Sequence, residues 1–157
     1  MKQRIRVDGE PVAPWCVGFA RFQVGASVAG TTLVVGVRCR FGGLDSDHVA
    51  LLDTGAHWSI VGGEMAELLE DEAGESIEIA AMATRLGTIH GRLHRLVVTL
   101  AADEGDDLDV PTTLLLAPSW SGPPVLGYRG FLDRVRFGLD PGNGADDQWM
   151  FFGGAGA

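Results

Sequence analysis

Apolar and polar residues alternate along much of this 157-residue chain, with the period of two that is typical of β-strands. In residues 31–41, one face would be apolar and the other would carry Gly36, Arg38 and Arg40. Turn-forming residues fill positions 42–47, so this strand and the next, residues 48–52, are expected to form a hairpin. Further strands are predicted over residues 17–28, 75–84, 88–101, 110–118 and 148–152.

Two short helices interrupt this pattern. In Glu64–Glu72, Met65, Leu68 and Leu69 would share one side, which predicts a helix near residues 64–71. A second is predicted near residues 128–134. The chain shows no internal repeat and no linker, so we expect one mainly β domain over residues 1–157, with flexible ends apart from residues 148–152.

The composition narrows the class of partner. Acidic residues outnumber basic ones by 21 to 12, for a net charge of −9, which argues against nucleic acid as a partner. No apolar run approaches the roughly 20 residues of a membrane span, and no apolar segment follows the basic N-terminus as it does in a secretory signal. We therefore expect a cytoplasmic protein with no membrane contact.

Metal and thiol chemistry are not favoured. Cys16 and Cys39 are expected to be reduced and buried, although the sequence leaves a disulfide between them open. His90 and His94 lie four apart in a strand pattern, so exposed or hydrogen-bonded histidines are expected rather than metal ligands. The acidic run at residues 103–109 lacks the spacing of a calcium loop and is expected to be solvated. We expect no metal and no cofactor.

Asp53-Thr54-Gly55 directly follows an apolar strand. As a site, it would offer a carboxylate, a hydroxyl and a glycine that permits a sharp turn and a close approach. One carboxylate cannot serve as both acid and base, whereas two that share a proton can. Because the chain holds one such motif, a working pair would need Asp53 from a second copy on a two-fold axis.

The segment "LLDTGAHWSIV" resembles the active-site turn of the retropepsin-like aspartic proteases, and "PVLGYRGFLDRVRF" resembles their downstream apolar-apolar-Gly motif. The order of elements over residues 17–140 matches, and the bacterial branch is the most similar. The resemblance implies a closed acid-protease barrel, a symmetric homodimer, and an endopeptidase acting on peptides or proteins. The segment 148–152 would be suited to the dimer interface.

The resemblance also implies roles for particular residues. Asp53 would be catalytic, Thr54 would brace the turn, Gly55 would accept the substrate backbone, and Ala56 would complete the turn. Val125, Leu126 and Gly127 would lie behind it. Trp58 would line the substrate cleft. A β-hairpin flap would be formed by the following residues: Thr84, Arg85, Leu86, Gly87 and Thr88.

Two departures concern subunit contacts and substrate subsites. Viral members have Gly-Arg-Asp or Gly-Arg-Asn where this chain has Gly127-Tyr128-Arg129, so the arginine is displaced by one position. His57 and Trp58 replace an acidic pair of the viral enzymes. Two alternatives stay open: a catalytically silent dimerisation or peptide-binding module with the same fold, and an unrelated ligand-binding β-barrel in which the motif is only a turn.

Overall fold

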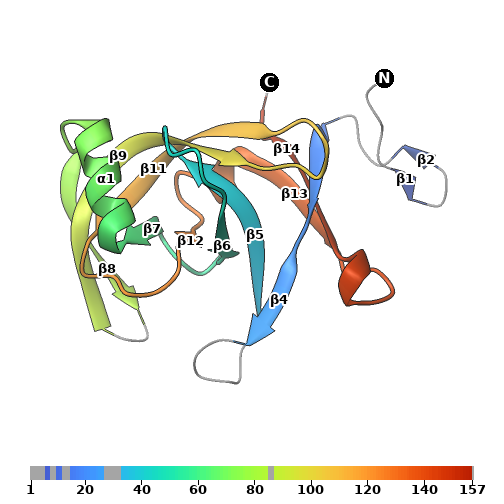
Figure 1. Cartoon of the computed structure of the whole chain (residues 1–157), viewed down its shortest axis with the longest axis horizontal. Coiled ribbons are helices and arrows are strands. Elements are labelled where there is room, and N and C mark those ends of the chain that lie inside the picture. Colours follow the sequence, from blue (N-terminus) through green and yellow to red (C-terminus); the bar gives the residue numbers. More distant parts are fainter. Residues whose placement is uncertain (1–5, 8–9, 12–14, 27–32, 85–86, 157) are drawn as a thin grey trace.

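A computed structural model describes residues 6–7, 10–11, 15–26, 33–84 and 87–156 (Figure 1). Its largest sheet has eight strands, which lie side by side in the following order: β4 (Gln23–Ala26), β5 (Leu33–Phe41), β6 (His48–Leu52), β12 (Val125–Leu126), β7 (Ser59–Gly62), β11 (Leu108–Ala117), β9 (Gly87–Leu100) and β8 (Glu78–Thr84). The far ends of β5 and β9 also pair, from Cys39–Leu100 to Phe41–Val98. This pairing joins the sheet into a ring, and the mainly β class is confirmed.

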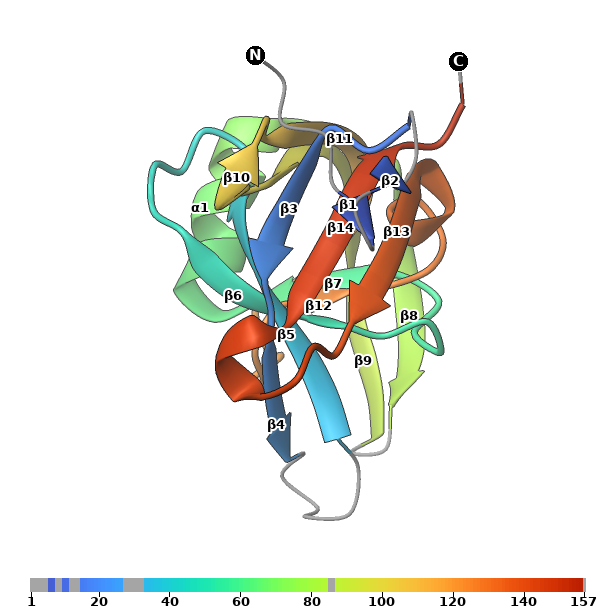
Figure 2. The same cartoon turned by 90° about the vertical axis from the view of Figure 1, so that its right-hand side faces the viewer.

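A smaller sheet of four strands packs against the ring (Figure 2). Its order is β10 (Glu104–Gly105), β3 (Gly18–Arg21), β14 (Trp149–Gly154) and β13 (Val135–Asp140). The strand predicted at 148–152 is therefore present as β14, and both of its edges pair within the same chain. It has no free edge for a strand of another copy. Two short strands, β1 (Arg6–Val7) and β2 (Glu10–Pro11), pair with each other.

The strand predicted over 17–28 is divided between the two sheets. It breaks at Phe22, whose ring is buried and whose N–H donates to Gln148 O. The preceding residues form β3 in the small sheet and the following ones form β4 beside β5. The hairpins predicted at 42–47 and near 85–87 are both present.

The helix α1 (Gly63–Ala73) confirms the prediction near 64–71 and covers part of β7, β9 and β11. Its buried residues are Ala66 and Leu69, whereas Leu68, expected on the same side, is 57% exposed. Both buried residues join the larger core cluster, which also draws on β5, β11 and β14. A second cluster lies around β7, β12 and the adjoining parts of β9 and β11.

The helix predicted over 128–134 is wrong in extent. Only a 3₁₀ turn, η1 (Leu132–Arg134), forms there, and a similar turn, η2 (Ala145–Asp147), precedes β14. Gly130 has a φ of +83°, which an α-helix does not allow, and its N–H donates to Asp133 Oδ1 at 2.9 Å. This glycine bends the chain between Gly127 and η1, so only the last part of the predicted span is helical.

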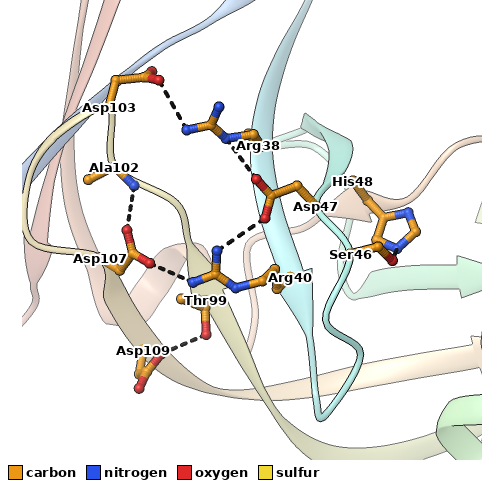
Figure 3. A network of polar contacts seen from close by, with 10 residues as sticks. All are labelled: Arg38, Arg40, Ser46, Asp47, His48, Thr99, Ala102, Asp103, Asp107 and Asp109. Carbon is orange, nitrogen blue, oxygen red and sulfur yellow. Dashed lines mark hydrogen bonds and ion pairs between the residues drawn. The ribbon is translucent and has the colours of Figure 1, made fainter.

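A polar network ties the β5–β6 hairpin to the acidic run at 103–109 (Figure 3). Arg38 bridges Asp47 and Asp103, and Arg40 bridges Asp47 and Asp107. The N–H of Ala102 and, to a lesser degree, Arg40 lower the pKa of Asp107. The acidic run is therefore not merely solvated, because it contains β10 and holds two outward arginines of β5.

Candidate active site

Asp53 lies in an exposed turn at the end of β6. The N–H of Ala56 donates to Asp53 O at 3.1 Å, which closes the turn, and the N–H of Gly55 donates to Asp53 Oδ1 at 2.8 Å. Asp53, Thr54 and Gly55 are all exposed, and Ala56 is half-buried. The backbone thus holds one carboxylate oxygen, while the side chain stays open to solvent.

The strand β12 supports this turn from behind. It runs between β6 and β7, parallel to the first and antiparallel to the second. The N–H of Asp53 donates to Leu126 O at 3.0 Å, and that of Leu51 donates to Pro124 O at 2.9 Å. Val125 and Leu126 are buried, so the segment expected behind the turn lies there and fixes where the backbone of Asp53 can be.

Gly127 must be a glycine because it passes against the turn. A Cβ added there would lie 2.4 Å from Trp58 O and 2.9 Å from Ala56 O, closer than real Cβ atoms come to backbone oxygen. Its N–H donates to the buried hydroxyl of Ser59 at 2.9 Å. Sequence reasoning gave Ser59 no role; the available signal was one polar residue in an otherwise apolar strand.

The chain then continues alongside the turn. Tyr128 N–H donates to Ala56 O at 2.8 Å, and Arg129 N–H donates to His57 O at 2.9 Å. The Arg129 guanidinium stacks on the half-buried Trp58, 5.2 Å from its ring centroid. The two departures from the viral pattern, at 57–58 and 128–129, are therefore in contact with each other beside Asp53.

The hairpin expected to act as a flap joins β8 to β9. Thr84 pairs with Gly87 and donates from its hydroxyl to Gly87 O at 2.7 Å, and Thr88 pairs with Ala83. Arg85 and Leu86, at the expected tip, lie outside the described residues. The role of the hairpin as a flap stays a prediction.

The bracing role expected of Thr54 also stays a prediction. Its side chain makes no hydrogen bond within the part of the chain that the structure describes. A cavity of about 510 Å³ lies elsewhere, between the end of α1 and the middle of β9 and β11, and none of its lining residues belongs to the Asp53 turn. This cavity is therefore a groove that is separate from the Asp53 turn, and it is not part of the candidate site.

The expectation for the two histidines is half wrong. His90 is exposed, but His94 is 3% exposed and neither of its ring nitrogens has a hydrogen-bond partner in the described chain. Burial lowers its pKa, and the charge of Arg92 lowers it further, while Glu70 opposes both. Along β9, His94 lies on the same strand face as Leu96 and Val98, and α1 packs against this strand.

The cysteines are free, as expected, although only Cys39 is fully buried and Cys16 is half-buried. Burial, the largest cause, raises the pKa of Cys39 to about 12, so it is an inert thiol. No group of three or more potential metal ligands occurs among the described residues. Within the same residues, no helix has the length and apolar character needed to span a bilayer.

Comparison with protein-family models finds none that matches this chain, and a search of curated proteins finds no match either.

Proposed function

We propose that this chain is an aspartic endopeptidase that acts on peptides or proteins as a symmetric homodimer. The observation that supports this most is the exposed Asp53 turn, held from behind by β12 between β6 and β7. An ordinary strand-ending turn needs no such support. Here the backbone of the turn is bonded to Leu126 and Tyr128, and the N–H of Gly55 holds one oxygen of the solvent-facing carboxylate.

The chemistry needs two carboxylates. Asp53 of one subunit and Asp53 of the partner subunit would hold a water between them, with one proton shared by the pair. The ionised carboxylate takes a proton from the water as it attacks the scissile carbonyl, and the protonated one donates to the carbonyl oxygen. Each subunit would then contribute its ring of strands as one of the two barrels of an acid-protease dimer.

The proposed pairing brings the two Asp53 turns together rather than the two C-terminal strands. The edges of β14 are both occupied by β3 and β13, so residues 148–152 can contact another copy only through side chains. The side chains of His57, Tyr128 and Arg129, on the segments that continue from or run alongside the turn, are exposed, and Tyr128 is 56% exposed. An extended substrate would lie between the turns and the β8–β9 hairpins, pairing strand to strand.

Digestion of a randomised peptide mixture by the wild-type protein and by Asp53→Asn tests the proposal. The amide keeps the shape of the side chain but cannot share the proton, so we expect cleavage by the wild type and a loss of at least about a thousandfold in the variant. Sedimentation should show a dimer for both proteins. Equal cleavage by both would refute the catalytic role, and cleavage by a protein that is only monomeric would refute the two-copy site.

A further inference from the structure

An arginine lies on the segment that runs alongside the proposed catalytic turn. Arg129 follows Gly127 by two residues, its N–H donates to His57 O at 2.9 Å, and its guanidinium lies over the Trp58 ring at 5.2 Å from the centroid. The His57 ring also contacts the Trp58 ring, in an edge-to-face arrangement with the two centroids 4.8 Å apart. The parallel bridge between Trp58 and Arg129 fixes both backbones.

Among the residues that the structure describes, none offers this guanidinium a carboxylate partner. Arg38 and Arg40, the arginines of β5, each bridge two aspartates, and Arg134 donates to Pro111 O. Among the described residues, the Arg129 side chain has only its contact with Trp58. Other exposed arginines, Arg136 among them, also have no ion pair among the described residues, and what distinguishes Arg129 is its contact with Trp58 next to the Asp53 turn.

Stacking on the indole suits Arg129 to binding a carboxylate from outside. The Trp58 ring restrains the guanidinium of this exposed arginine, and a guanidinium can donate two parallel hydrogen bonds to one carboxylate. A lysine could supply the charge but not the fork. Because Arg129 and Asp53 are both exposed on segments that contact the same turn, a substrate lying across Asp53 would pass Arg129.

We propose that Arg129, oriented by Trp58, determines specificity by binding an acidic side chain of the substrate close to the scissile bond. The inference rests on the proposed function and adds the substrate class: extended peptides with Asp or Glu at one defined position. In a symmetric dimer, each half of the site would carry one such arginine.

The experiment begins with the cleavage sites of the randomised mixture and continues with two synthetic peptides around the best site, one with Glu and one with Gln at the preferred position. For the wild type, we expect kcat/KM for the Glu peptide to exceed that for the Gln peptide by about tenfold or more, the size of one charge-assisted contact. Arg129→Gln should bring this ratio close to one, because kcat/KM should fall for the Glu peptide and stay unchanged for the Gln peptide. Arg129→Lys should keep part of it.

Arg136→Gln is the matched control, since Arg136 is an exposed arginine on β13 in the small sheet. It should keep the wild-type ratio. The wild-type ratio should also fall as salt is raised, because the contact is between charges near the surface. A ratio near one in the wild type, or one that Arg129→Gln leaves unchanged, would overturn the inference while leaving the protease proposal standing. The inference would also be overturned if Arg129→Gln only prevented dimerisation and did not change the preference between the two peptides.

Binding of the same two peptides to Asp53→Asn separates the two proposals. This variant should bind the Glu peptide more tightly than the Gln peptide, and Asp53→Asn combined with Arg129→Gln should not. If the wild type cleaves nothing, the randomised mixture itself is the binding probe. Enrichment of Asp- and Glu-containing peptides by Asp53→Asn, lost when Arg129→Gln is added, would mean that catalysis fails and the acidic-peptide site stands. If neither cleavage nor this enrichment is found, both fail.

Discussion

The hydroxyl of Ser59 is one buried atom on which the geometry of the Asp53 turn depends. It accepts the N–H of Gly127, and the residue before Gly127 in turn accepts the N–H of Asp53 through its carbonyl. Ser59 therefore positions the carboxylate through two short links. Removing the hydroxyl would leave a buried N–H without an acceptor.

We expect Ser59→Ala to lower the free energy of unfolding by about 1–3 kcal/mol, the cost of a buried donor left unpaired. Urea denaturation measures this change, and hydrogen exchange at the Gly127 amide should become faster. Ser46→Ala is the control, because the Ser46 hydroxyl is exposed and contacts only His48. If Ser59→Ala costs no more than this control, the hydrogen bond does not hold the turn.

Gly127 could be predicted from the sequence, but its partner could not. The apolar-apolar-Gly motif is local and marks a close backbone approach. Ser59 is 68 positions away, and a small polar residue at the start of an apolar strand is equally compatible with a surface position. Only the insertion of β12 between β6 and β7 brings the two together.

At the scale of elements, His94 makes the packing of α1 on the sheet sensitive to acid. Along β9, His94 lies on the same strand face as Leu96 and Val98. Val98 belongs to the core cluster that contains Leu69 of α1, and Leu96 packs against that cluster. Burial lowers the pKa of His94 in the folded chain, so below pH 6.5 the unfolded chain binds this proton more readily than the folded chain does. Stability is then complete above this pH and falls as the pH decreases below it.

We expect the wild-type free energy of unfolding to fall below pH 6.5 by up to about 1.4 kcal/mol per pH unit from this one group. His94→Leu should remove that part of the slope, because it leaves nothing to protonate. His90→Gln changes an exposed histidine on the same strand and should leave the slope unaltered. Denaturation series at several pH values compare the three, and an unchanged slope in His94→Leu would contradict this account.

The helices and strands could be predicted where the sequence pattern is local. The predictions failed where the chain bends. The α1 helix and the 85–87 hairpin follow from periodicity and turn residues alone. The break at Phe22 does not, because the alternation continues through it while the chain passes from one sheet to the other. At 128–134, a short helix was expected, and the positive φ of Gly130 excludes an α-helix over that span.

At the scale of the molecule, the sequence predicted a mainly β class but not which strands would meet. The pairings β5–β9 and β3–β14 join residues far apart in the chain, and alternation alone carries no information on partners. The small sheet was missed for this reason. The strand at 148–152 was expected and its neighbours were not.

A chain ending at Asp147 should not hold the native fold. It loses the buried Met150 and Phe152 and leaves β3 and β13 without their common partner, a loss of several kcal/mol and comparable with the whole stability of a small domain. A chain ending at Ala155 keeps β14 and is the control. Circular dichroism and thermal melting compare them, and equal melting temperatures would show that β14 is dispensable.

The central place of β14 also bears on synthesis at the ribosome. The strand β3 is translated early, but it pairs with residues 149–152 of β14. These residues are translated after all of the strands of the ring. The nascent chain therefore cannot complete its fold before residue 154 has emerged, however quickly its earlier hairpins form. If two copies pair as proposed, they can do so in the native fold only after β14 has been translated.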